Sequence, residues 1–340
     1  MKFFGLDIGS HKIKVAQLER KGDQYQLIAF SSGPSTAKGL LSEAESDLTA
    51  LAEAVKKVYQ EAKVTTKNVA SALPQDQVFS RVITLPKLSE KELVSALKWE
   101  AEQYVPIPLN EVTLAHQIVG KVKKDGGEKM EVFLVAASNH FIEKIIKVIK
   151  VAGLNLVSLE TEIIAMARSL ITPDSNTTML VDFGAKATDL AIVENGQVVF
   201  THSIATAGEA LTRAVASELG LEPSQAEAYK KAYGVDPAKL EGKVRSAIDP
   251  IFEVIVKEME KTIQFYQTEE REGKIRRVIL TGGTAGLPEV ASLLAKKLNL
   301  EIELGDPFTR VLDNDLSTKI PTEEAPFYAV AVGLAMKEIK

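Results

Sequence analysis

The chain has 340 residues, of which 45% are hydrophobic and 26% are charged, and its formal net charge at pH 7 is −5. This composition is ordinary for a globular protein. The length suits two lobes of roughly 150 residues. Because acidic and basic residues are mixed along the chain, the sequence argues against a dedicated nucleic-acid binder, which would carry a clustered basic face. The absence of cysteine excludes disulfides, thiol nucleophiles and thiolate-bound zinc.

The chain opens with three predicted strands joined by tight turns. Apolar and polar residues alternate in the segments 3–7, 12–18 and 25–30. The first turn holds Asp7, Gly9, Ser10 and His11, and Lys14 follows on the outgoing strand. Glycine lets the backbone approach a phosphate, successive N–H groups form an anion-binding concavity, and aspartate suits the hydration shell of Mg²⁺. The turn therefore has the groups to bind a phosphate chain, with His11 either touching it or simply exposed.

Residues 77–153 form a distinctive block. The patterns predict a strand at 78–85, a helix opened by the capping box of Ser89 and Glu92 and ended by Pro106, strands at 111–119 and 129–137, and a helix at 141–151. We interpret the block as a compact subdomain, about residues 78–152, inserted in the first lobe.

Two features of this block have alternative interpretations. Leu93, Leu97, Ala101 and Tyr104 share one face of the predicted helix, so we interpret Tyr104, together with Trp99, as core. Anchoring of a partner protein is the alternative. The charged loop 121–128 is interpreted as a solvated hairpin tip.

The second half of the chain repeats the opening unit. Strands are predicted at 178–182, 188–193 and 197–201. The turn after the first of them holds Asp182 and Gly184, and the glycine of the next turn follows the aspartate by 14 residues (196 − 182), against 15 (22 − 7) in the first unit. A single Asp-x-Gly is usually just a turn, but this agreement predicts a duplicated unit whose two turns close on one phosphate chain.

The rest of the second half is predicted to be mainly helical. Helices are expected from Gly208, over 224–233, and over 246–270. The last is expected to bury one stripe of residues: Ile251, Val254, Ile255, Met259, Ile263 and Tyr266. In the middle helix Glu227 and Lys230 lie three residues apart, which by itself indicates no more than a surface contact.

A glycine-rich turn follows the last predicted strand of this half. The strand 277–280 leads to Gly282, Gly283 and Thr284, and a helix is predicted over 287–297 with Pro288 near its first turn. Backbone N–H groups at such a helix start can face an anionic ligand. A tight strand-to-helix connection with no ligand is the alternative.

The ends of the chain predict no membrane segment. No apolar stretch reaches the roughly 20 residues that span a bilayer, and the N-terminus enters a strand at once, so no signal peptide is expected. The small apolar residues of 327–336 are expected to pack against the first lobe. We therefore expect a cytoplasmic protein that reaches a membrane through partners.

Taken together, these motifs resemble a known family. Asp7, Gly9, Ser10 and Lys14, then Asp182, Gly184 and Thr188, then Gly282, Gly283 and Thr284 resemble the phosphate-one, phosphate-two and adenosine motifs of actin-like ATPases, in that order. The segment 85–109, with its Trp99 and paired prolines, resembles the PilM family of type IV pilus assembly, which is related to the division protein FtsA.

The resemblance implies an α/β, actin-like ATPase (ribonuclease H-like) fold of two duplicated lobes. Lobe I would comprise 1–172 and 326–340, with the insert at about 78–152 resembling a subdomain of FtsA. Lobe II would comprise 173–325, with a helical subdomain at about 223–272.

The resemblance also implies ATP and Mg²⁺ as ligands. The nucleotide-binding residues would be Asp7, Gly9, Ser10, His11, Lys14, Asp182, Gly184, Ala185, Lys186, Thr188, Gly208, Glu209, Glu227, Lys230, Gly282, Gly283 and Thr284. Asp7 and Asp182 would hold Mg²⁺ through water. The candidates for a catalytic role are Glu160 and Glu162, at the start of a helix predicted near 159–164, and Asp182. For the two glutamates the alternative is that they only favour the helix N-terminus.

As partners, the resemblance implies the N-terminal cytoplasmic peptide of the inner-membrane protein PilN, bound in a groove beside the insert, and other pilus assembly proteins at the inner membrane. It implies no nucleic acid. Two alternatives share the same phosphate turns: a filament-forming, FtsA-like division ATPase, which would sediment with Mg-ATP, and a small-molecule kinase, which would phosphorylate an added substrate.

Overall fold

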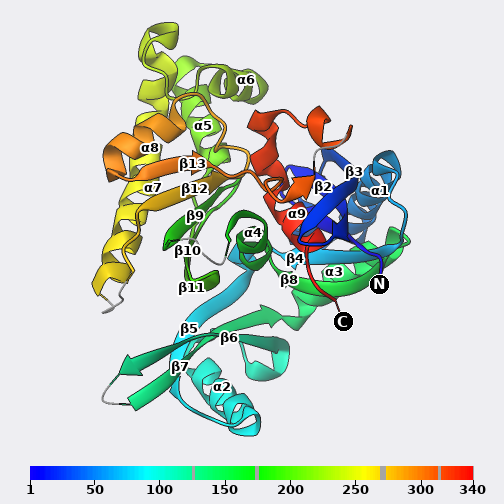
Figure 1. Cartoon of the computed structure of the whole chain (residues 1–340). Coiled ribbons are helices and arrows are strands. Elements are labelled where there is room, and N and C mark those ends of the chain that lie inside the picture. Colours follow the sequence, from blue (N-terminus) through cyan, green and yellow to red (C-terminus); the bar gives the residue numbers. More distant parts are fainter. Residues whose placement is uncertain (125–126, 173–175, 269–272, 313–314, 340) are drawn as a thin grey trace.

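The computed structural model describes residues 1–124, 127–172, 176–268, 273–312 and 315–339. Two large lobes lie side by side, and a smaller unit projects from the first (Figure 1). The expected α/β architecture is confirmed, with one mixed sheet in each large lobe and a third sheet in the smaller unit.

The first lobe is built on a six-stranded sheet in the order β14-β3-β2-β1-β4-β8. Its strands are β1 (Phe4–Ile8), β2 (Lys12–Lys21), β3 (Gln24–Pro34), β4 (Asn68–Leu73), β8 (Asn155–Thr161) and β14 (Val311–Leu312). Helices α1 (Glu45–Ala62) and α3 (Asn139–Val151) share a buried core with β1 and β2 on one face. On the other face lies α9 (Ala329–Ala335), formed by the small residues of the C-terminal segment as predicted.

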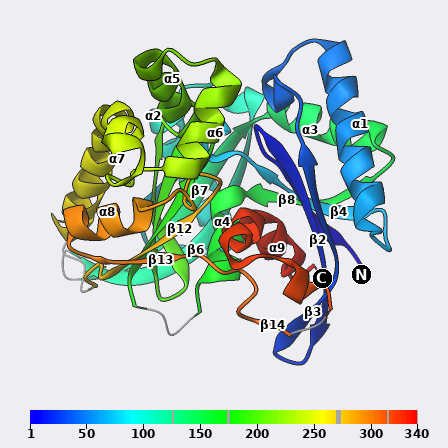
Figure 2. The same cartoon turned by 90° about the horizontal axis from the view of Figure 1, so that it is seen from above.

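The second lobe has a five-stranded sheet in the order β11-β10-β9-β12-β13. Its strands are β9 (Thr178–Phe183), β10 (Thr188–Glu194), β11 (Gln197–Ile204), β12 (Arg277–Thr281) and β13 (Glu301–Leu304). Helices α5 (Gly208–Leu219), α6 (Pro223–Tyr233), α7 (Lys243–Thr268) and α8 (Val290–Leu298) enclose its largest core. Figure 2 shows these helices gathered on one side of the lobe.

Helix α4 (Glu162–Leu170) lies between the two large sheets. Its buried Ile163 and Met166 share a core with β4 of the first lobe, with β9 and β10 of the second, and with α9. Helix α4 thus contacts both lobes, and it begins at Glu162 (Figure 1).

The duplicated unit is confirmed in backbone register. In the β1–β2 pair Asp7 lies opposite Lys14, and in the β9–β10 pair Asp182 lies opposite Asp189. Both turns close in the same way, since the Gly9 N–H donates to the Lys12 carbonyl and the Gly184 N–H to the Ala187 carbonyl, each at 3.1 Å.

The smaller unit, called the insert below, is a three-stranded sheet in the order β5-β7-β6 covered by one helix. Its elements are β5 (Val78–Pro86), α2 (Glu90–Tyr104), β6 (Val112–Lys124) and β7 (Gly127–Ser138). The predicted capping box of Ser89 and Glu92 is confirmed at the start of α2. The strands run much further into the predicted loop 121–128 than expected, and Asp125 and Gly126 lie outside the described residues.

Two aromatic residues of α2 were wrongly assigned to the core. Trp99 is 62% exposed and Tyr104 is 39% exposed, whereas Leu93, Leu97 and Ala101 are buried as predicted. Tyr104 lies at the last turn of the helix, beyond the end of the buried stripe, and its ring stacks under the Arg81 guanidinium at 4.1 Å.

Other elements differ in detail from the predictions. Helix α3 was grouped with the insert, but its buried face packs against α1 and joins the core of the first lobe. Val254 on α7 is 47% exposed and not part of the buried stripe, and the predicted helix end at Glu270 lies outside the described residues. Helix α8 begins at Val290 and not at Leu287, because Glu289 has a left-handed φ of 64° that interrupts the helical backbone.

Candidate functional site

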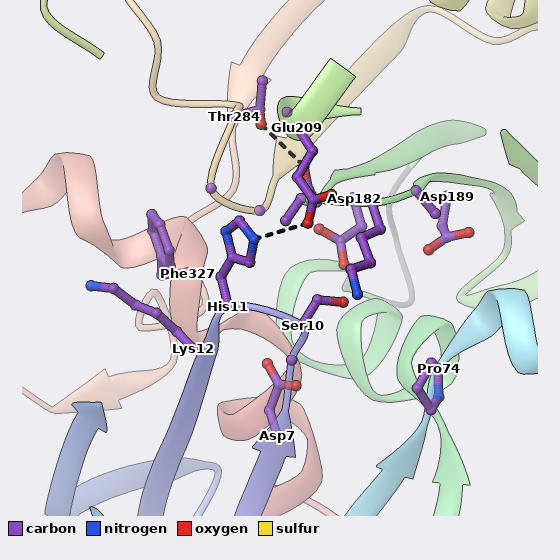
Figure 3. Close-up of a pocket in the computed structure, with 18 of the residues that line it drawn as sticks. Asp7, Ser10, His11, Lys12, Pro74, Asp182, Asp189, Glu209, Thr284 and Phe327 are labelled. Carbon is purple, nitrogen blue, oxygen red and sulfur yellow. Dashed lines mark hydrogen bonds and ion pairs between the residues drawn. The ribbon is translucent and has the colours of Figure 1, made fainter. Parts of the chain in front are cut away.

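A cleft between the lobes is lined by both repeated turns. Figure 3 shows Asp7, Ser10 and His11 of the first turn facing Asp182 of the second lobe. The imidazole Nε2 of His11 and Oε1 of Glu209, at the start of α5, lie 2.9 Å apart across this cleft. The geometry that the duplication predicted, two turns opening onto one shared space, is present.

Most of the predicted site residues line this cleft. They are Asp7, Gly9, Ser10, His11, Lys14, Glu162, Asp182, Gly184, Ala185, Lys186, Gly208, Glu209, Glu227, Lys230, Gly282, Gly283 and Thr284. These residues come from six separate segments, so the cleft exists only once both lobes have folded.

Two predicted residues lie elsewhere. Glu160 is on β8, not at a helix start, and its carboxylate binds Arg168 and Lys337 away from the cleft. Because the chain passes from strand β8 to helix α4 between Glu160 and Glu162, the separation of two residues does not place both carboxylates on one face. Thr188 is fully buried, and its hydroxyl donates to the Thr206 carbonyl at 2.8 Å, where it stabilises the start of β10.

Two glycines bring backbone into the cleft where a side chain would not fit. Gly282 has φ +82°, and a Cβ there would lie 2.3 Å from Oδ1 of Asp182. A Cβ on Gly208 would lie 2.6 Å from Oγ1 of Thr284. Gly282 requires glycine for both conformation and space, and Gly208 for space alone, which leaves room for a ligand beside the backbone.

The Glu227–Lys230 pair is more than a surface contact. Lys230 is 4% exposed, and its Nζ donates to the Gly208 carbonyl at 3.0 Å and to Thr212 Oγ1 at 2.9 Å while lying 2.7 Å from Glu227. Burial lowers the pKa of Lys230, and Glu227 offsets that effect only in part. The lysine thereby anchors the start of α5 to α6 at the rim of the cleft.

The ammonium group of Lys14 lies beside the first turn. Its Nζ donates to Oδ2 of Asp7 at 2.6 Å, and both side chains are largely buried. Burial alone would lower the pKa of Lys14, but the charge of Asp7 and its hydrogen bond, with smaller effects of Asp182 and Glu162, leave the pKa raised. Lys14 therefore stays charged at neutral pH.

Several carboxylates converge on the same space. Burial raises the pKa of Glu162 well above its usual value, and the charges of Asp7, Asp182 and Asp189 raise it further. Burial, followed by the charge of Asp7, also raises the pKa of Asp182, against the effect of Lys14. Such a cluster is stabilised by a bound cation, and oxygen ligands are those that Mg²⁺ prefers.

These residues fit a magnesium-bound nucleotide better than a metal held by protein alone. Within the described ranges, no group of three or more His, Cys, Asp or Glu side chains has the geometry to hold a metal ion. Mg²⁺ usually keeps several waters and binds substrate phosphates through one or two carboxylates. The turns at Gly9 and Gly184 supply the phosphate-facing backbone, and Asp7 and Asp182 supply the carboxylates.

Sequence reasoning missed Asp189, which also lines the cleft. It is 7% exposed, and its Oδ1 has no hydrogen-bond partner in the described part of the chain. Burial raises its pKa to about 7, assisted by the charge of Asp182 and opposed by a hydrogen bond to Ser203. The duplication contained the signal, because Asp189 follows Asp182 by the same seven residues that separate Lys14 from Asp7.

We expect Asp189→Asn to stabilise the protein in a pH-dependent way. The unfolded aspartate ionises near pH 4 and the folded one near pH 7, so the wild type loses stability as pH rises between them, and the loss is complete above about 7. The variant should gain about 2–4 kcal/mol of unfolding free energy at pH 8 and less at pH 5, at about 1.4 kcal/mol per pKa unit. Urea unfolding at pH 5 and pH 8 measures the unfolding free energy, and Asp23→Asn, at an exposed position, is the control. An equal gain in stability at the two pH values would contradict the prediction.

Other cleft residues had no signal in the sequence. Phe327, which precedes α9, lies with its ring 5.5 Å from Lys12 Nζ and 5.9 Å from Lys14 Nζ. Pro74 and Asp76, between β4 and β5, form part of the opposite wall. These residues reach the cleft through long-range packing of the C-terminal segment and the insert, which no local pattern reports.

The chain is similar to known proteins over nearly its whole length. The model of the family described as type IV pilus assembly protein PilM matches residues 5–339. The solved structure of a PilM–PilN type IV pilus biogenesis complex has a chain 28% identical to this one with a TM-score of 0.85, covering 99% of this chain and 98% of that one. The cell division protein FtsA of Pseudomonas aeruginosa is 24% identical, over 98% of this chain and 88% of FtsA.

The expected actin-like ATPase fold is confirmed by the likeness to a further solved structure. MreB5 of Spiroplasma citri bound to AMPPNP matches with a TM-score of 0.53 at 15% identity, over 97% of this chain and 94% of that one.

In the described parts of the chain, no helix combines the length and apolarity that a bilayer-crossing segment needs.

Proposed function

The chain belongs to the PilM family of type IV pilus assembly proteins, and from this premise we propose that it is a cytoplasmic ATP-binding scaffold that holds the N-terminal segment of PilN. The observation that carries the nucleotide half is the pair of equivalent turns at Gly9 and Gly184 that open onto one cleft. PilN would in turn hold the scaffold at the inner membrane, beside other pilus assembly proteins.

In this proposal the two turns bind the phosphates from either side. Gly9 and Gly184 let the backbone approach, and Lys14 contributes positive charge. Gly282 and Lys230 would line the nucleoside end of the cleft. Mg²⁺, when bound, would neutralise part of the phosphate charge next to Asp7 and Asp182.

Nucleotide would act first as a conformational ligand and second as a substrate. Of the catalytic candidates, Glu162 and Asp182 line the cleft and Glu160 does not. Hydrolysis needs a polar group that orients water. Glu162, buried at the N-terminus of α4, is the candidate that the geometry favours for that position.

For PilN, we propose the groove between the insert and α4. It is lined by Gln117, Val119, Phe133, Ile164, Ala167, Arg168, Ile171, Gly196, Gln197, Val198 and Arg310. Strand β6 forms one edge of the insert sheet, so an extended peptide can add alongside it. The groove combines apolar side chains with two arginines, which suits an extended segment with apolar anchors and a carboxylate or carbonyl facing the guanidinium groups.

Val119→Arg is expected to weaken binding of a synthetic PilN N-terminal peptide at least about tenfold, because a charged side chain would fill the apolar lining. Fluorescence anisotropy of the labelled peptide measures the affinity. Ile118→Arg is the matched control, since Ile118 is half exposed and outside the groove lining. Equal affinities for the two variants would place the peptide elsewhere.

Calorimetric titration of the whole chain with Mg-ATP and with the PilN peptide tests the proposal as a whole. We expect submicromolar to micromolar dissociation constants for ATP, about −8 kcal/mol at the weak end. Failure to bind Mg-ATP, or failure to bind the PilN peptide, would refute the proposed function. Sedimentation in Mg-ATP separates it from a filament-forming ATPase, which would pellet.

A further inference from the structure

The nucleotide cleft and the proposed peptide groove share two structural elements. Helix α4 begins at Glu162 in the cleft, and its next residues, including Ile164 and Arg168, line the groove. Strand β11 forms the groove wall at Val198 and carries Thr201 three residues further on. A rearrangement at either site therefore has a short physical path to the other.

A chain of hydrogen bonds leads from the cleft to β11. Oε2 of Glu162 accepts from the backbone N–H of Gln75 at 3.3 Å. The side-chain Nε2 of Gln75 donates to Oγ of Ser80 on β5 at 2.7 Å, and that oxygen lies 2.9 Å from Oγ1 of Thr201. These bonds connect the cleft, the first strand of the insert and the second lobe.

Gln75 occupies the joint where the chain leaves the first lobe for the insert. It follows β4 and precedes β5, and its neighbours Pro74 and Asp76 line the cleft, as Figure 3 shows for Pro74. Gln75 itself is 4% exposed, and its side chain bonds to the insert instead. Movement of the cleft wall at this joint is thus transmitted to β5.

The amide of Gln75 is only partly satisfied. Its Oε1 is buried without a hydrogen-bond partner among the described residues. Exchanging the amide oxygen and nitrogen would let Ser80 donate to Oε1 but would leave the NH₂ group unpaired. Because an unpaired buried polar atom disfavours the state that contains it, a rearrangement that gives the amide a second partner is favoured. The unpaired oxygen of Gln75 therefore favours a second arrangement of the joint.

We propose that Gln75, Ser80 and Thr201 form a relay through which nucleotide binding in the cleft and peptide binding in the groove depend on each other. This inference rests on the proposed function, since it needs both ligands. By thermodynamic linkage, Mg-ATP changes the affinity for the PilN peptide by the same factor by which the peptide changes the affinity for Mg-ATP. The affinity of the groove beside the insert for the peptide thereby depends on whether nucleotide occupies the cleft.

Calorimetry of the full chain measures this coupling directly. The synthetic PilN peptide is titrated with and without saturating Mg-ATP, and the reverse titration checks reciprocity. In the wild type we expect the two peptide affinities to differ at least about fivefold. In Gln75→Ala, Ser80→Ala and Thr201→Val the difference should fall below about twofold, while each ligand alone binds within about threefold of its wild-type affinity.

Ser95→Ala is the matched control for Ser80→Ala. Ser95 is an exposed serine of the insert whose hydroxyl donates within its own helix, to the Lys91 carbonyl at 3.3 Å, so this variant should keep the wild-type coupling. Thermal unfolding confirms that each variant is folded, and the loss of one hydroxyl in Ser80→Ala or Thr201→Val leaves the backbone intact.

The outcomes separate this inference from the proposed function. If the wild type binds both ligands with no change in affinity, or if all three relay variants keep the full coupling, the relay is refuted while the proposed function stands. If the wild type binds only one of the two ligands, the proposed function fails and the relay fails with it.

Discussion

Replacing Lys14 by alanine is expected to weaken Mg-ATP binding at least about 100-fold, equivalent to about 2.7 kcal/mol. Two effects act in the same direction. The variant loses a cation beside the first phosphate turn, and it leaves the buried carboxylate of Asp7 without its partner at 2.6 Å. Asp182 and Glu162 face the same space, so the variant also loses the positive charge that offsets these acidic groups and the phosphates.

Loss of a buried ion pair also affects folding, which must be separated from binding. Removing one partner typically costs about 3–5 kcal/mol. The double variant Lys14→Met/Asp7→Asn removes both charges, so it should be more stable than Lys14→Ala and still bind Mg-ATP poorly. Lys21→Ala, at the exposed far end of β2, is the control. Wild-type affinity in a folded double variant would show that the first turn does not bind the phosphates.

The predictions from sequence succeeded where a local pattern determines the structure. Alternation of apolar residues located the strands of both repeated units, and the spacing from Asp7 and from Asp182 correctly predicted that the two turns share a cleft. Such turns depend on residues a few positions apart, so their geometry is largely encoded in the segment itself.

The errors arose where a boundary or a distant segment decides the outcome. Strand β8 continues to Thr161, whereas a helix was expected there, and the carboxylate of Glu160 binds Arg168 and Lys337 away from the cleft. Tyr104 fits the helical period of α2 but lies beyond the surface that the sheet covers. Phe327 reaches the cleft because α9 packs against β1, which no local pattern reports.

Gly333→Ala is expected to destabilise the whole protein, because α9 packs directly on the backbone of α4. A Cβ at position 333 would lie 1.8 Å from the carbonyl oxygen of Ala165, and the Gly333 carbonyl also accepts a hydrogen bond from Arg168 at 2.8 Å. On the opposite side of α9, a Cβ on Gly5 would lie 2.0 Å from the Ala331 carbonyl oxygen. The helix therefore has no free direction in which to move.

We expect Gly333→Ala to lower the unfolding free energy by at least about 3 kcal/mol and the melting temperature by on the order of 6 °C or more, although alanine is the better helix former. Differential scanning fluorimetry and urea unfolding measure this. Gly127→Ala, on the exposed β6–β7 hairpin, is the control, since a Cβ there meets nothing within 4 Å. Because the obstacle in α4 is the backbone carbonyl of residue 165, adding Ala165→Gly to Gly333→Ala should not restore stability. If the double variant were as stable as the wild type, the side chain of Ala165, and not its peptide group, would set the distance between α4 and α9.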